Sequence, residues 1–234
     1  GSEMCIRDRN RSAYWVPAII DVRTGRPIVP GSPIHDPGVP EHGFYYKTKY
    51  SQIPFPSYQA PPLGLRMIAG DGKATGPQDI QIASFSCNGG PGTSGIPSCT
   101  VGGYVTMHVT FPNCWDGRNL DSPDHKSHMA YAVGPAGGVC PSSHPVPIPN
   151  IQFNIHWAVR AGDDTRSWRL SSDNYAGGPG GYSLHADWWD GWDTATMQTQ
   201  VRNCLQTAPR ECGSGNLGDG RHLSYVWPLL APRN

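Results

Sequence analysis

Residues 104–111, YVTMHVTF, and residues 151–160, IQFNIHWAVR, decide the fold class of this 234-residue chain. In both segments an apolar side chain occupies every second position and a polar one stands between. Because successive side chains of a strand point to opposite faces of a sheet, this period of two predicts two strands, each with one core face and one polar face.

The polar faces of these two strands each centre on a histidine. His108 is flanked by Thr106 and Thr110, and His156 follows Asn154 by two residues. Such a face is either solvated or forms a groove for a ligand. We therefore take His108, His156 and Asn154 as candidate substrate-binding residues.

The rest of the chain indicates further short strands joined by turns. Its 29 Gly and 24 Pro residues exceed average usage and break long helices. An apolar strand-like run begins residues 12–22, and further strands are expected at 65–69, 80–87, 168–171, 181–185 and 223–227. Only residues 194–205 have a helical pattern, with Met197, Val201 and Leu205 on one face and Asp193 as the N-cap. We expect a mainly β fold, an antiparallel jelly-roll-like sandwich with long Pro/Gly-rich loops and one short helix.

The first residues are set apart from this fold. Gly1 and Ser2 resemble a protease cleavage scar, and the following EMCIRDR resembles a translated sequencing adapter. We expect residues 1–11 to be foreign and residues 12–234 to form a single β domain whose natural beginning, signal peptide included, has been lost. Cys5 then carries no information.

Six further cysteines make an even set. Fifteen pairings are possible, and pairing between sequence neighbours costs the least loop-closure entropy. The expected disulfides are therefore Cys87–Cys99, Cys114–Cys140 and Cys204–Cys212. No C-x-x-C pair is present, and the set favours a secreted, extracellular protein.

Charge and hydropathy exclude several partners. Eighteen basic and 18 acidic residues cancel, and no basic run could follow a phosphate backbone, so nucleic acid is not expected. No apolar stretch approaches the roughly 18 residues that span a bilayer, so no membrane partner is expected either.

Two segments concentrate the polar chemistry. Residues 111–131 read FPNCWDGRNLDSPDHKSHMAY, and residues 182–193 read YSLHADWWDGWD. The first of these segments lacks helix or strand periodicity, and polar groups crowded onto a loop favour binding or chemistry. In both segments, acids and imidazoles beside indoles suit a polar ligand with apolar faces, such as a sugar. We expect the two segments to form one cleft.

Longer motifs resemble a known family. They are AYWVP (13–17), RMIAGD (66–71), the 111–131 segment, GVCPSSHPVP (138–147) and YSLHAD (182–187). Together they resemble an uncharacterised family of secreted fungal and bacterial proteins that carries a domain-of-unknown-function label. In fungi its members are sometimes joined to WSC carbohydrate-binding domains. Members usually have an upstream Ser-His-x-His-x-Phe-Phe-Gly motif and further cysteines, which this chain lacks.

Three kinds of chemistry fit these residues. In a polysaccharide hydrolase, one protonated and one ionised carboxyl flank the scissile bond. The candidate catalytic residues are Asp116, Asp121, Asp187, His125 and His185, and the candidate sugar-stacking residues are Trp115, Trp188, Trp189 and Trp192. A serine nucleophile is disfavoured, because no G-x-S-x-G elbow is present.

The other two readings use the same segments. A divalent metal could be bound by Asp124, His125, His128, His144 and His185, although D-H-x-x-H on a loop is not a metal signature. A non-catalytic carbohydrate-binding or cell-wall module needs only the indoles and hydrogen-bonding carboxylates. The density of Asp and His beside the indoles favours the hydrolase.

Overall fold

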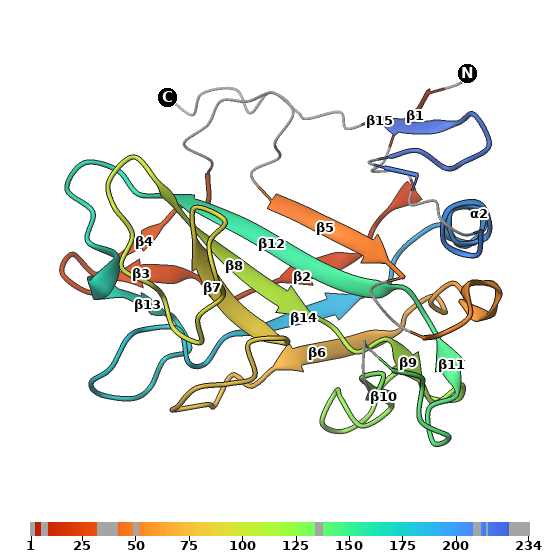
Figure 1. Ribbon diagram of the computed structural model, residues 1–234, viewed down its shortest axis with the longest axis horizontal. Helices are drawn as coiled ribbons and strands as arrows, with labels where there is room; N and C mark the ends of the chain where they lie inside the picture. The colour runs from red at the N-terminus through yellow and green to blue at the C-terminus, as the bar shows by residue number, and fades with distance from the viewer. Residues whose placement is uncertain are drawn as a thin grey trace.

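The computed structural model describes residues 3–5, 9–31, 42–48, 52–133, 138–207, 212–213 and 215–224. It is a mainly β, sandwich-like fold with a short α-helix (Figure 1). The sheets are antiparallel, apart from one parallel pair near the chain ends. The fold class predicted from the alternating segments is confirmed.

The larger sheet contains the two segments that predicted the fold. Its strand order is β5 (His42–Lys47), β12 (Asn150–Ala158), β8 (Tyr104–Thr110) and β7 (Ala83–Cys87). Its inner face packs in the core and includes the buried residues Phe85, Met107, Phe153 and Trp157. Its other face contains the polar residues of both strands, so the period of two is read correctly.

The second layer consists of two three-stranded sheets. One has the order β2 (Ala13–Trp15), β14 (His185–Trp189) and β6 (Arg66–Gly70); the other is β13 (Trp168–Leu170), β3 (Ile19–Asp21) and β4 (Arg26–Ile28). In Figure 1, β2 and β14 pass behind β8 and β12. Met67, Trp188, Ile19 and Trp168 join the larger sheet in one continuous core.

Short elements complete the fold. The strands β9 (Cys114–Trp115), β10 (Met129–Ala130) and β11 (Val146–Pro147) form a small sheet. Two 3-10 turns cover Phe55–Ser57 and Thr165–Ser167. Within the segment expected to be adapter-like, β1 (Glu3–Cys5) pairs in parallel with β15 (His222–Ser224).

The predicted helix is present with its predicted cap. Helix α2 (Thr194–Gln200) begins after Asp193, whose carboxylate accepts a hydrogen bond from the Thr196 amide at 3.0 Å. A π-helical turn, Val201–Leu205, continues it. Met197, Val201 and Leu205 are buried in a second hydrophobic cluster, as their four-residue spacing indicates. In the described part of the chain, no helix is long and apolar enough to span a membrane.

The three disulfides join the expected partners: Cys87–Cys99, Cys114–Cys140 and Cys204–Cys212. Each closes a short loop, with 12, 26 and 8 residues of separation. The preference for pairing between sequence neighbours is therefore confirmed.

The bounds of one predicted strand, residues 181–185, are wrong. Residues 181–184 form a turn, and the strand begins at His185. Residues 185–189, in the middle of the 182–193 segment, are thus the central strand of their sheet. Acidic residues concealed its alternation, in which Ala186 and Trp188 are buried and His185 and Asp187 are only partly buried.

The hydroxyl of Tyr46 joins the layers. It is hydrogen-bonded to the hydroxyl of Tyr14 at 2.7 Å and accepts hydrogen bonds from the indole nitrogens of Trp188 at 3.2 Å and Trp192 at 2.9 Å. These four residues come from β5, β2, β14 and the segment before α2. Burial raises the pKa of Tyr46 well above its ordinary value, so the hydroxyl keeps its proton.

We expect Tyr46→Phe to lower the free energy of unfolding by about 2–4 kcal/mol, because two indole N–H groups lose their acceptor. Tyr45→Phe, at an exposed neighbouring position, is the matched control and should change stability little. Urea unfolding of both variants measures the difference. Equal stabilities would show that the junction contributes nothing.

Asp190 generates a second stability prediction. Its side chain is buried, its Oδ1 has no hydrogen-bond partner among the described residues, and burial raises its pKa to about 7. The folded state therefore binds the proton more tightly than the unfolded state, and stability falls as pH rises from about 4 to 7. Asp190→Asn should remove this loss, which amounts to a few kcal/mol at about 1.36 kcal/mol per pKa unit.

Urea unfolding at pH 4 and pH 8 tests this expectation. The variant and the wild type should be similar at pH 4, and the variant should be the more stable at pH 8. Parallel pH profiles would contradict the assignment of the raised pKa to Asp190.

Candidate functional site

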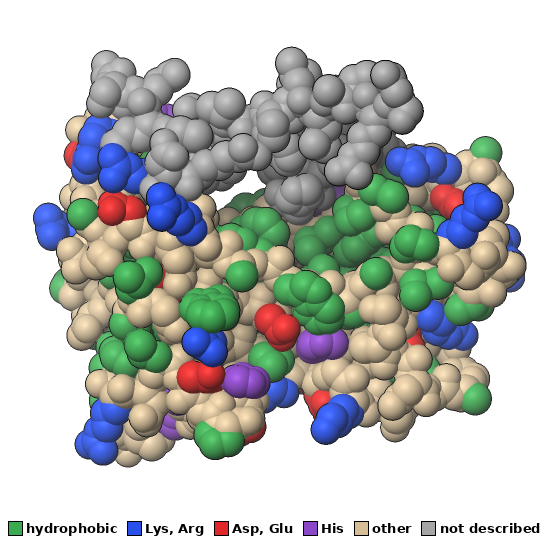
Figure 2. Space-filling model, turned by 180° about the vertical axis from the view of Figure 1, so that it is seen from behind, with side chains coloured by type: hydrophobic (Ala, Val, Ile, Leu, Met, Phe, Trp, Pro, Cys, Tyr) green, Lys and Arg blue, Asp and Glu red, His purple; other side chains and the backbone are tan. Residues whose placement is uncertain are grey.

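The outward face of the β2–β14–β6 sheet carries the candidate site. Ala186 and Trp188 of β14 face the core, so His185, Asp187 and Trp189 lie on the other face. Asp187 pairs with Trp15 on one side and with Ile68 on the other. Figure 2 views the molecule from behind, and acidic, histidine and hydrophobic side chains lie close together on that side.

The other polar segment, residues 111–131, lies against the free edge of this sheet, which is β6. Within residues 120–128, the carbonyls of Leu120 and His125 each accept a hydrogen bond from β6, at 2.9 Å from the amides of Arg66 and Ile68 respectively. The Lys126 ammonium donates to the Gly70 carbonyl. The two Asp/His segments are therefore neighbours on one face, with Ile68 between Asp187 and His125.

An aspartate–histidine pair occupies this loop. Nδ1 of His125 and Oδ1 of Asp121 are 2.6 Å apart, and Arg66 lies 3.6 Å from the other carboxylate oxygen. Burial acts to raise the pKa of Asp121, but hydrogen bonds from His125 and the Ser122 amide outweigh it and the pKa is lowered. An ionised Asp121 fixes the proton on Nδ1, so neutral His125 has its lone pair on Nε2.

The backbone of His125 is unusual. Its φ of 54° lies in the left-handed region, which non-glycine residues seldom occupy. A turn holds it there, with the His125 amide donating to the Ser122 carbonyl at 2.8 Å. Such conformations concentrate at functional sites, where surrounding contacts compensate their cost.

His185 is oriented by three contacts. Its Nδ1 donates to the Ser183 carbonyl at 2.9 Å, which leaves the lone pair on Nε2 in the neutral ring. The Trp15 ring lies at 5.3 Å between centroids. Gly72 closes the third side, where a Cβ atom would be 2.9 Å from the imidazole, so only glycine fits without displacing the ring.

Asp187 is the least compensated group of the face. Its Oδ1 is buried and has no hydrogen-bond partner among the described residues. Burial raises its pKa, and the nearby charges of His185, His125 and Lys126 offset that only partly. The arrangement places a carboxyl with a raised pKa on the same face as two imidazoles.

Two exposed indoles belong to the same face. Trp15 is 49% exposed and Trp189 is 46% exposed. The guanidinium of Arg66 stacks on the Trp189 ring at 3.8 Å, which fixes that indole in place. Flat apolar surface thus lies beside the carboxyl and imidazole groups.

Two indoles predicted to contact a substrate do not reach the surface. Trp188 and Trp192 are buried, 1% and 5% exposed, and donate to Tyr46 inside the protein. That part of the prediction is wrong, because Trp188 is on the inward face of β14 and Trp192 packs in the second hydrophobic cluster. Trp115 is partly buried and donates to the Asn119 carbonyl at 2.6 Å, within its own loop.

Two predicted site carboxylates organise turns. Asp116 accepts from the amides of Arg118 and Asn119 and from the Asn119 side chain. Asp124 accepts from Ser122 Oγ and from the amides of Lys126 and Ser127. These bonds are typical of Asx-turns, and they leave neither carboxylate poised for proton transfer.

The remaining predicted metal ligands are occupied by hydrogen bonds. His128 is buried and contacts Ser122 Oγ at 2.7 Å and the Arg66 carbonyl at 2.6 Å. His144 contacts Ser143 Oγ and the Ser127 carbonyl. In the described ranges no three His, Cys, Asp or Glu side chains are grouped so as to hold a metal ion.

The third predicted group lies elsewhere. His108, His156 and Asn154 are on the outward face of the larger sheet, whose inner face shares its core with β14. They therefore face away from Asp187, on the opposite side of the sandwich. His108 Nδ1 donates to Asn154 Oδ1 at 2.9 Å, and His156 contacts Thr106 at 2.8 Å.

A comparison with known protein families shows which family the chain belongs to. The model of a family described as "Domain of unknown function (DUF1996)" matches residues 2–192. The chain belongs to the DUF1996 family. Its membership of an uncharacterised family, indicated by the motifs, is thereby confirmed. No curated protein and no solved structure matches it.

Three residues of this DUF1996 site escaped the sequence analysis. Trp15 and Arg66 belong to the quoted AYWVP and RMIAGD motifs, and Lys126 directly follows His125. Trp15 could have been found from the apolar residues that follow it, had β2 been recognised as a strand with Tyr14 inward. Arg66 needed the register with Trp189, which one sequence does not give.

Carboxyl titration tests the electrostatics of the DUF1996 site. By carbon-detected NMR, Asp187 should titrate above the ordinary aspartate pKa of 3.8 and Asp121 below it. His185→Ala should raise the pKa of Asp187 further, since a charge that lowers it is removed. His222→Ala, which removes a histidine far along the chain, is the matched control and should leave the pKa of Asp187 unchanged. An Asp187 pKa below that of Asp121 would refute the assignment.

Proposed function

We propose that this DUF1996 protein is a secreted polysaccharide hydrolase with Asp187 as its general acid. The proposal is carried by one observation: a partly buried carboxyl with an unpaired Oδ1 and a raised pKa lies on the same face as His185, His125 and two exposed indoles. A general acid must hold its proton near working pH and release it to the leaving oxygen. Desolvation shifts the pKa of Asp187 upward, in the direction that this role requires.

Asp121 and His125 supply the complementary base. His125 Nε2 takes a proton from water while Asp121 stabilises the imidazolium that forms. The backbone of His125 is two strand positions from that of Asp187, or about 10 Å at the usual strand spacing.

The exposed indoles support a carbohydrate substrate, and the disulfides support an extracellular location. Trp15 and Trp189 offer flat apolar surfaces on which sugar rings stack. Arg66 and Lys126 remain as donors toward hydroxyl groups. Three disulfides are typical of proteins that fold in an oxidising compartment, which supports secretion.

A carbohydrate-binding module is the second candidate. The observation in its favour is that Trp15 and Trp189 lie on one sheet face, because two such indoles bind a glycan without any acid or base. The two candidates differ in a single property, the turnover of glycosidic bonds.

Substitution of Asp187 separates them. Asp187→Asn should lower turnover on a panel of cell-wall polysaccharides by about 10²–10⁴-fold while glycan binding persists, because the amide keeps the shape and loses the proton. Asp116→Asn is the matched control and should retain turnover, since Asp116 bonds only within its loop. Trp15→Ala should weaken binding.

Each alternative outcome has its own interpretation. Binding without turnover by the wild type would favour the module. Full activity of Asp187→Asn would remove Asp187 from the mechanism. Activity lost equally in Asp116→Asn, with unchanged folding, would move the acid to the other carboxyl.

A further inference from the structure

A groove of about 260 Å³ lies on the outward face of the larger sheet, on the opposite side from Asp187. Its floor is formed by β7 and β8. Residues 80–82 form one wall, since the Ile82 carbonyl accepts from the Thr110 amide at 2.8 Å. Gly90 and Gly92 border it from the loop that returns along the free edge of β7.

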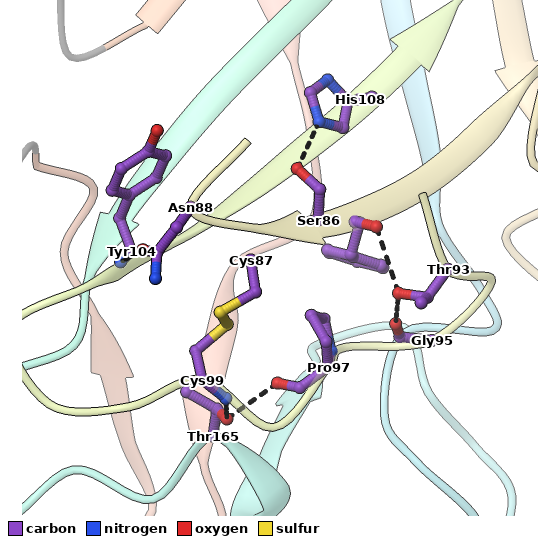
Figure 3. Close-up of a disulfide and its surroundings, with 11 residues drawn as sticks. Ser86, Cys87, Asn88, Thr93, Gly95, Pro97, Cys99, Tyr104, His108 and Thr165 are labelled. Carbon is purple, nitrogen blue, oxygen red and sulfur yellow. Dashed lines mark hydrogen bonds between the residues drawn. A yellow bond between two sulfur atoms is a disulfide. The ribbon is translucent and has the colours of Figure 1, made fainter. Parts of the chain in front are cut away.

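That loop is held in place covalently and by hydrogen bonds. The backbones of Thr93 and Phe85 bond to each other in both directions, at 2.7 and 2.8 Å. Figure 3 shows Thr93 beside β7 and the Cys87–Cys99 disulfide closing the loop. The groove therefore has fixed edges and does not depend on a disordered segment.

The polar lining is uncharged. Among the residues that line the groove there is no Lys, Arg, Asp or Glu. The polar side chains are those of Gln81, Ser84, Ser86, His108, Thr110 and Gln152. Ile80 and Ile82 add apolar surface at one side. This combination suits a neutral ligand with several hydroxyl groups and one apolar face.

Two hydroxyls in the groove have no partner. Ser84 and Thr110 are 6% and 7% exposed, and within the described residues neither side-chain hydroxyl makes a hydrogen bond. Neither hydroxyl oxygen is among the buried side-chain atoms that lack a partner, so both oxygens are accessible from the groove. These two hydroxyls therefore remain available to whatever occupies the groove.

A chain of two hydrogen bonds orients Ser86 and His108 in the groove. Ser86 donates to Nε2 of His108 at 2.8 Å, and Nδ1 of His108 donates to Asn154 at 2.9 Å (Figure 3 shows the first bond). Burial lowers the pKa of His108, which keeps the ring neutral. Ser86 Oγ then has its lone pairs free to accept from a ligand.

We propose that this groove is a second ligand site that binds one neutral sugar unit through Ser84, Ser86 and Thr110. Its volume is just below the range of drug-sized pockets, which fits one ring of a sugar chain while the neighbouring units stay outside the groove. The site stands apart from Asp187 and needs no turnover. It would hold a polysaccharide on the face of the protein opposite the hydrolytic site.

Amide NMR of the full chain tests the site with cellobiose, diacetylchitobiose and maltose as neutral probes and glucuronate as a charged one. At least one neutral probe should shift the amides of Ser84, Gly92 and Thr110 saturably. The double change Ser84→Ala and Thr110→Val should raise the Kd roughly tenfold, since two hydrogen bonds are lost. Thr199→Val, which changes a surface hydroxyl on α2, is the matched control.

The variants also separate this proposal from the hydrolase. Asp187→Asn should leave binding in the groove unchanged whether or not it abolishes turnover. The groove proposal is overturned if no neutral probe shifts these amides. It is also overturned if the double variant, shown to be folded by its thermal unfolding, binds as tightly as wild type, or if glucuronate binds more tightly than the neutral sugars.

Discussion

The hydroxyl of Tyr46 is the constraint from which the geometry of the candidate site follows. It accepts from the indoles of Trp188 and Trp192 and is bonded to Tyr14, so three segments must bring these groups to one buried point. Because side chains alternate along a strand, an inward Trp188 forces its neighbours Asp187 and Trp189 outward. The same interaction that joins the two layers therefore presents the acid and one indole on the surface.

The free edge of β6 imposes a second constraint. Unpaired amides at a sheet edge need acceptors, and here the carbonyls of Leu120 and His125 supply them. The loop is anchored by the Cys114–Cys140 disulfide and by the pairing of β9 with β10. A loop that completes a sheet is better ordered than one that crosses solvent. This explains how His125 is held in a left-handed conformation next to Asp187.

The sequence predicts the fold well wherever the period of two is clear, as in β8 and β12, and it predicts α2 from Asp193 and the four-residue spacing. It also predicts the disulfides, because loop closure depends on sequence distance alone. It fails at Trp188 and Trp192, since indoles among aspartates look exposed when the strand is not recognised. The candidate residues predicted from the sequence include Asp121, His125, His185 and Asp187. The sequence cannot distinguish these residues from Asp116 and Asp124, which organise turns. That distinction depends on hydrogen bonds within turns, which composition does not reveal.

A comparison of Asp187, which is partly buried, with the buried carboxyl of Asp21 shows what is unusual about Asp187. Asp21 is buried, but Arg23 and Ser167 bond to its oxygens at 2.6 and 2.8 Å and its pKa is lowered. Asp187 receives no such bond at Oδ1, and its pKa is raised. Leaving a buried polar atom unpaired costs about 1–3 kcal/mol, and an apolar residue at this position would avoid that cost. Asp190 also has an unpaired Oδ1, so a missing partner alone does not mark a site. Asp187 differs in that it shares an outward sheet face with His185 and two exposed indoles, which supports the role in proton transfer that we propose for it.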